Sequence, residues 1–159
     1  MANGDVRLVQ DFSWPMEGPY ASIKSFIDSD EFITAWDGVR AVVDALLKLD
    51  PSIHAASMDG KDAFRTRLAK STQWPGLVVQ TTEDVFFLDL FLPFGLVSAT
   101  GVWGLVADAT RSIIMKRMCG RVVVFKWIDD FLVLRTDPAV SLDDVRPCSS
   151  GGSHAKISA

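Results

Sequence analysis

The chain has few of the residues that mark several protein classes. Among 159 residues there are two cysteines, two histidines and one tyrosine. Cys119 and Cys148 cannot build a disulfide framework, and their spacing to His54 and His154 matches no zinc-site pattern. These shortages exclude a disulfide-rich secreted scaffold and a zinc module. A reducing intracellular compartment, cytoplasmic or nuclear, is the default expectation.

Positive charge is also scarce. The chain has 16 lysines and arginines and 20 aspartates and glutamates, which gives a net charge of −4 and a pI of about 5.0. Phosphate contacts need clustered Lys and Arg, so the charge balance alone argues against a free-standing nucleic-acid binder. Residues 1–7 lack the apolar stretch of a secretory signal, and we expect no signal peptide.

One long run, residues 90–107, has no charged side chain. Its length is near the minimum for a membrane span, but prolines and glycines interrupt it and no positive residues flank it. A membrane hairpin is the least favoured interpretation, and we expect no membrane association. The hydrophobic content of 48% and mean hydropathy of +0.21 instead predict a folded domain with a real core.

Apolar periodicity predicts a mixed order of elements. We expect helices at 31–49 and 98–118, a short helix ending near 70, strands at 6–12 and 52–58, and hairpins joining 77–80 to 85–91 and 122–128 to 131–134. This order predicts an α+β fold in which helices back an antiparallel sheet. Apolar periodicity ends after residue 135, and a Gly/Ser-rich, mobile tail is expected there.

Small residues punctuate the long second helix. Gly101 and Gly104 are expected to let another backbone approach closely, and Gly120 to end the helix. Ser98 is a candidate N-cap. Earlier in the chain, Gly60 is the expected source of a sharp turn after the strand at 52–58.

Two adjacent aspartates, Asp129 and Asp130, stand between two apolar runs at the tip of the last expected hairpin. Neighbouring carboxylates repel unless positive charge is close, and a divalent cation commonly provides it. Asp59, at the end of the strand at 52–58, is the best candidate for a third carboxylate. One Asp from a strand and two from a hairpin suit a two-metal phosphoryl-transfer site. Aspartates are also common in turns and caps without any metal.

Three segments then resemble a known family. Residues 58–64, 92–95 and 125–131 are similar, in order and approximate spacing, to the first three palm motifs of reverse transcriptases from retroelements. Residues 7–12 resemble the basic strand of the fingers region in that family. The resemblance implies a reverse-transcriptase-like palm with partial fingers. Its implied parts are a partial fingers segment with a connecting helix at 1–51, a palm with motifs A, B and C at 52–136, and a tail at 137–159.

The resemblance also implies an activity. It assigns Asp59, Asp129 and Asp130 as catalytic residues and as ligands of two Mg²⁺ or Mn²⁺ ions, and it names primer–template nucleic acid and a deoxynucleoside triphosphate as partners. The reaction would be RNA-directed DNA polymerase chemistry, a nucleotidyl transfer to a primer 3′-hydroxyl. The nucleotide-binding positions it implies are Arg7, Lys61, Asp62, Ala63, Phe64, Pro93, Phe94 and Gly95. The ring of Phe64 would exclude a ribonucleotide 2′-hydroxyl.

The chain departs from the family pattern in two ways. Trp127 stands where the commonest motif has Tyr or Phe, and as a bulky apolar group it is equally well explained as a core residue. Nothing after residue 135 resembles a primer grip, a thumb or a ribonuclease H domain, which points to a truncated or degenerate copy with weak or absent activity. A non-catalytic α+β interaction module, or a relic of a transposable element, remains the alternative. The sequence does not predict an oligomeric state.

Overall fold

The computed structural model of the protein describes residues 10–145 and has an α+β fold with antiparallel sheets. The chain forms two compact units that interleave along the sequence. We call them the hairpin unit, residues 10–33 and 62–103, and the sheet unit, residues 34–61 and 104–145. The division into fingers and palm stays a prediction. Arg7 and most of the strand expected at 6–12 lie outside the described residues.

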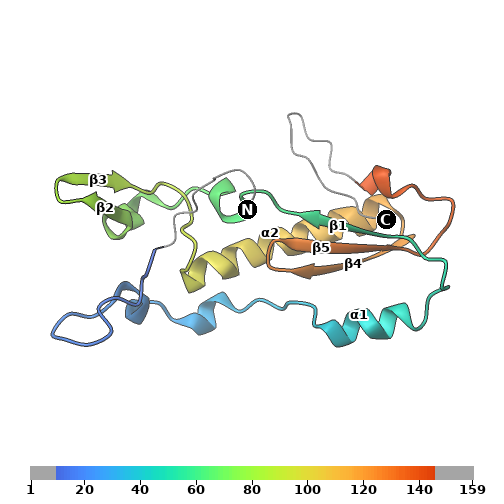
Figure 1. The fold of residues 1–159 in the computed structure, drawn as a ribbon, viewed down its shortest axis with the longest axis horizontal. Helices are drawn as coiled ribbons and strands as arrows, with labels where there is room; N and C mark the ends of the chain where they lie inside the picture. The colour runs from blue at the N-terminus through green and yellow to red at the C-terminus, as the bar shows by residue number, and fades with distance from the viewer. Residues whose placement is uncertain (1–9, 146–159) are drawn as a thin grey trace. The chain divides into compact units, whose positions relative to one another are not determined.

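The sheet unit contains three antiparallel strands in the order β1-β5-β4 (Figure 1). They are β1 (Ala55–Asp59), β4 (Val122–Trp127) and β5 (Asp130–Arg135). The two strands β4 and β5 form a hairpin, and β1 adds to β5 from a distant part of the sequence. The helix α1 (Val39–Leu46) and a short 3-10 helix (Leu142–Val145) belong to the same unit.

Alternation along the strands separates two faces of this sheet. One, the buried face, supplies most of the core of the unit. It carries Ala56, Val122, Val124, Lys126, Phe131 and Val133, all buried. The other, the acidic face, carries Asp59, Trp127 and Asp130 side by side at its turn end.

A lysine occupies the buried face. The Nζ atom of Lys126 lies 2.5 Å from a carboxylate oxygen of Asp108 and 4.9 Å from the ring centroid of Trp36. The ion pair does not have the alignment of a hydrogen bond. Since an unpaired buried ammonium would be costly, this pair and the aromatic ring compensate the charge and connect β4 to the long helix.

The outer edge of β4 is covered by a single residue. The backbone N–H of Asp37 donates to the Lys126 carbonyl at 3.1 Å, and its carboxylate accepts from the Lys126 backbone N–H at 2.9 Å. Arg111 donates to the same carboxylate at 3.3 Å. Asp37 therefore satisfies edge groups that would otherwise be open to pairing with another strand, and it fixes the start of α1.

The hairpin unit holds the second sheet, formed by β2 (Val78–Thr82) and β3 (Val85–Leu88). Its other regular elements are 3-10 helices at Ile23–Phe26, Ser29–Phe32, Ala63–Thr66 and Ser71–Leu77. A small core brings together Phe12, Ala69 and Leu77. Buried Asp89 pairs with Arg65, so this core also contains a compensated charge.

The long helix α2 (Val97–Arg117) runs from the hairpin unit into the sheet unit, with the division between Trp103 and Gly104. Gly101 behaves as expected, because a Cβ atom there would lie 2.7 Å from the backbone carbonyl oxygen of Phe32. At Gly104 the expectation of a close backbone was wrong, since the group that a Cβ would meet is the side chain of Thr34. The left-handed turn after the helix begins at Cys119, with φ of +51°, and continues at Gly120, with φ of +75°, so the prediction that Gly120 ends the helix was right only in part. In the described part of the chain, no helix is long and apolar enough to cross a membrane.

Several expected boundaries were wrong. The helix expected at 31–49 is interrupted, because residues 33–38 are extended and Asp37 bonds to β4 before α1 begins at Val39. The strand expected at 52–58 begins only at Ala55, since the Asp50 carboxylate accepts from the Ser52 backbone N–H and holds a turn. Residues 10–12 form no strand. Only a 3-10 helix, Ala63–Thr66, follows β1.

Two expected local roles were also wrong. Ser98 lies within the first turn of α2, which begins at Val97, so it is not the N-cap. The turn after β1 places its positive φ on Asp62, at +54°, rather than on Gly60. Gly60 instead donates a backbone hydrogen bond to Asp129. This hydrogen bond joins distant segments of the chain, so local sequence propensity could not predict the conformation of Gly60.

The close approach at Gly101 gives a stability prediction. Gly101→Ala places a methyl group against the Phe32 backbone, which cannot rotate away, and we expect the free energy of unfolding to fall by about 1–3 kcal/mol. Gly76→Ala is the matched control, because its methyl group would meet only Ile23 at an ordinary 3.7 Å. Urea denaturation measures both. A Gly101→Ala protein as stable as the control would contradict the close packing.

Candidate functional site

The three predicted aspartates come together at the turn end of the acidic face. In the register of β1 with β5, Asp59 lies directly opposite Asp130. Directly opposed residues of antiparallel strands have Cα atoms about 4.5–5.5 Å apart. The backbone N–H of Gly60 donates to the Asp129 carbonyl at 2.7 Å, which ties the end of β1 to the turn itself. Residues separated by about 70 positions are thus joined by backbone pairing.

The turn between β4 and β5 is tight and strained. Trp127 pairs with Asp130, so Ile128 and Asp129 form a two-residue connection. Ile128 has φ of +52°, a left-handed conformation that costs a residue with a Cβ about 1–2 kcal/mol. Hairpins of this length require positive φ, and a glycine or asparagine would adopt it more easily. Strain of this kind in a non-glycine residue is often found at functional sites.

The pKa of Asp130 reflects the proximity of the other two carboxylates. Partial burial raises its pKa above the usual value, and the nearby charges of Asp129 and Asp59 raise it further. Both neighbours act as negative charges on the same carboxyl group, which agrees with the strand register. A cation in this place would relieve the repulsion.

The donor set suits a hard divalent cation, because Mg²⁺ and Mn²⁺ prefer carboxylate oxygens. Within residues 10–145, however, no group of three or more His, Cys, Asp or Glu side chains is arranged to hold a metal ion. The residue types and the strand register that brings them together suit a cation, although the side chains do not form a ready site.

Trp127 lies on the acidic face beside Asp130 and is 54% exposed. The interpretation of this residue as a core aromatic was therefore wrong. Its position follows from strand alternation, which places residue 126 on the buried face and residue 127 on the other. An exposed indole next to a carboxylate can contact an aromatic or cationic ligand.

The positions expected to bind nucleotide divide between the two units. Lys61 is exposed at the end of β1, and its backbone N–H donates to the Asp59 carbonyl at 3.1 Å. The others belong to the hairpin unit, except Arg7, which lies outside the described residues. These are Asp62, Ala63, Phe64, Pro93, Phe94 and Gly95.

Within the hairpin unit, the two segments that were expected to bind nucleotide meet. The rings of Phe64 and Phe94 pack edge to face with centroids 5.6 Å apart, and Phe64 also lies 6.2 Å from Trp103. Phe64 is buried in this cluster. Gly95 has φ of +103°, and a Cβ there would lie 2.8 Å from the Gln10 carbonyl oxygen, so the glycine is required by the backbone. These contacts explain the residues by packing and leave their nucleotide roles as predictions.

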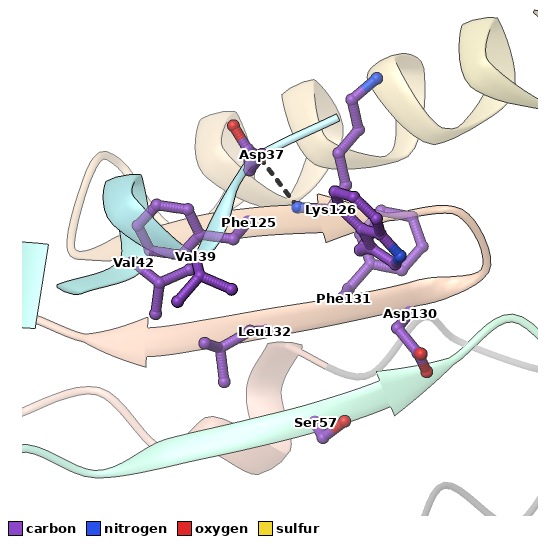
Figure 2. A pocket seen from close by; sticks show the side chains of 10 residues that line it. Asp37, Val39, Val42, Ser57, Phe125, Lys126, Asp130, Phe131 and Leu132 are labelled. Atoms are coloured by element: carbon purple, nitrogen blue, oxygen red, sulfur yellow. Dashed lines mark hydrogen bonds between the residues drawn. The ribbon is translucent and has the colours of Figure 1, made fainter. Parts of the chain in front are cut away.

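Sequence reasoning missed a cavity in the sheet unit. It has a volume of about 300 Å³ and lies between α1 and the acidic face (Figure 2). Its lining includes Asp37, Val39, Val42, Ser57, Phe125, Lys126, Trp127, Asp130, Phe131 and Leu132. The amphipathic pattern of α1 indicated an apolar face, but nothing in the sequence indicated which surface that face would cover.

The comparisons with known proteins do not place the chain in a family. No family model matches the sequence, and no curated protein is significantly similar to it.

The raised pKa of Asp130 gives a pH prediction. The folded protein holds this proton more tightly than the unfolded chain, so the group lowers stability as pH rises above about 4. We expect Asp130→Asn to raise the free energy of unfolding at pH 7 by up to about 0.5 kcal/mol, because the group is exposed, and to lose that advantage at pH 3.

Asp50→Asn is the control of opposite sign. Hydrogen bonds from the Ser52 side chain and backbone lower the pKa of Asp50, so its contribution is present at neutral pH and is lost as pH falls through the folded pKa. Removing that carboxylate should destabilise the protein at pH 7. Urea titrations of both variants at pH 3 and pH 7 measure the difference. A destabilising Asp130→Asn at pH 7 would contradict the crowding of the three carboxylates.

Proposed function

We propose that the sheet unit is the catalytic core of a nucleotidyltransferase of the reverse-transcriptase type, with Asp59, Asp129 and Asp130 as its metal-binding carboxylates. The observation that supports it is the pairing of Asp59 with Asp130, reinforced by the Gly60–Asp129 hydrogen bond. The sequence motifs point to the same three residues that this pairing brings together. A compartment that supplies Mg²⁺ and nucleotides, inside the cell, fits this role.

Each of the three aspartates would have a role that depends on its position. Asp59 and Asp129 would hold two divalent cations between β1 and the turn, and Asp130 would add charge from the start of β5. Bound there, the cations would lower the pKa of a primer 3′-hydroxyl and would stabilise the negative charge of the triphosphate. The strained turn would keep the Asp129 backbone fixed while its side chain binds.

A non-catalytic interaction module is the second candidate, and a specific observation favours it. Both strands of the β2–β3 hairpin expose large apolar side chains, including Val78, Phe86 and Phe87. Apolar surface of this kind commonly marks a contact with another macromolecule. In that case the three aspartates would be turn residues, and the arrangement without a ready metal site would be their working state.

Metal binding separates the two functions. We expect Mn²⁺ to bind the wild-type protein measurably in an electron paramagnetic resonance titration. Asp59→Asn and Asp129→Asn should each weaken that binding about tenfold or more, because each removes a negatively charged ligand. Asp84→Asn is the matched control, since Asp84 lies in the exposed turn of the β2–β3 hairpin. Equal Mn²⁺ affinity in all four proteins would reject the metal site.

Primer extension then tests the chemistry. With Mg²⁺, a primed RNA template and deoxynucleoside triphosphates, the wild-type protein should extend the primer weakly, and Asp129→Asn should reduce the extension to background. The Asp84→Asn protein should match the wild type. If the wild-type protein binds Mn²⁺ but extends the primer no more than Asp129→Asn does, the polymerase function is rejected. The protein would then be a metal-binding module without this activity.

A further inference from the structure

The cavity between α1 and the acidic face has apolar walls. Figure 2 shows Val39 and Val42 of α1 near Phe125 of β4, with Leu132 of β5 on the floor of the same space. A volume of about 300 Å³ is at the small end of the range for ligand pockets. The walls therefore suit a compact apolar group.

The cavity lies beside the start of α1, where Asp37 sets the position of the helix. Asp37 fixes the start of the helix through its two hydrogen bonds with the Lys126 backbone. No residue of α1 is buried, and Val39 is 80% exposed. The apolar side chains of the helix thus stand over the sheet and leave a groove that is defined by specific contacts at Asp37.

One end of the groove carries negative charge. Asp130 lines it, together with Ser57 and the exposed ring of Trp127. Asp37 also lines the groove, but its carboxylate is already engaged by Arg111 and the Lys126 backbone. The ion pairs found among residues 10–145 involve Asp37, Asp89 and Asp108, and none includes Asp130. Asp130 is therefore the carboxylate that can receive a cation from a ligand.

We propose that this groove binds a small amphiphilic amine. Its aromatic or aliphatic body would lie against Val39, Val42 and Leu132. Its ammonium group would donate to the Asp130 carboxylate beside the face of Trp127, where charge-assisted hydrogen bonding and a cation–π contact combine. The site is distinct from the proposed metal site in one testable respect, because Asp59 does not line the groove.

A pair of matched probes tests the proposal on the full chain. 4-Phenylbutylammonium and 4-phenylbutanol have nearly the same size, and only the first carries a charge. Isothermal titration calorimetry in a metal-free buffer should show the ammonium binding about tenfold more tightly than the alcohol. Asp130→Asn should remove that preference and leave the weaker apolar binding.

A second variant tests the location. Val39→Trp should fill the groove and abolish binding of both probes, and its exposed position lets the fold accept a larger side chain. Val43→Trp is the matched control, because Val43 is also exposed on α1 but does not line the groove. Absence of saturable binding by either probe, or equal binding in the Val39→Trp and wild-type proteins, would overturn the proposal.

Asp59→Asn distinguishes this inference from the proposed function. It should weaken Mn²⁺ binding while leaving the preference for the ammonium probe within about twofold of the wild type. Mn²⁺ binding without probe binding would overturn the groove and leave the metal site. Probe binding without Mn²⁺ binding would overturn the metal site and leave the groove. Loss of the ammonium preference in Asp59→Asn would overturn a separate amine site.

Discussion

The antiparallel pairing of β1 with β5 is the constraint on which the acidic face depends. It opposes Asp59 and Asp130, and it lets Gly60 reach the Asp129 carbonyl. Without it, Asp129 and Asp130 would be an ordinary acidic turn. The pairing is stabilised from the other side of the sheet, where buried aliphatic side chains and the Lys126–Asp108 ion pair bind the strands to α2. The buried apolar side chains on one face therefore hold the strands together despite the repulsion between the aspartates on the other face.

The same sheet shows how one residue can serve two elements. Asp37 pairs with the edge of β4 at Lys126 and also sets where α1 starts, while Trp127 and Asp130 on the acidic face stay exposed. The exposed indole of Trp127 and the crowded carboxylate of Asp130 lie at the border of the resulting groove. An apolar space and a negatively charged end are thus adjacent. Both proposed ligands, the divalent metal ion and the ammonium compound, are cations that this negative charge would attract.

Much of the local structure could be predicted from sequence because it depends on near neighbours. Periodicity located the long helix and the β4–β5 hairpin, and the close approach of a backbone at Gly101 followed from what a missing side chain permits. The break before α1 could not be predicted, since it arises from a hydrogen bond between Asp37 and a strand almost 90 residues away. The burial of Lys126 and the exposure of Trp127 depend on strand register for the same reason. The motifs suggested the three aspartates, but only the β1–β5 pairing places them together.

The most direct test of the central claim is the location of a bound cation. Sub-stoichiometric Mn²⁺ broadens the amide resonances of nearby residues in a nuclear magnetic resonance spectrum. We expect Gly60, Asp129 and Asp130 to lose intensity first and together, while Asp84 in the other hairpin keeps its signal. Equal broadening at Asp84, or no selective loss at the turn, would contradict the convergence of these three carboxylates on a cation.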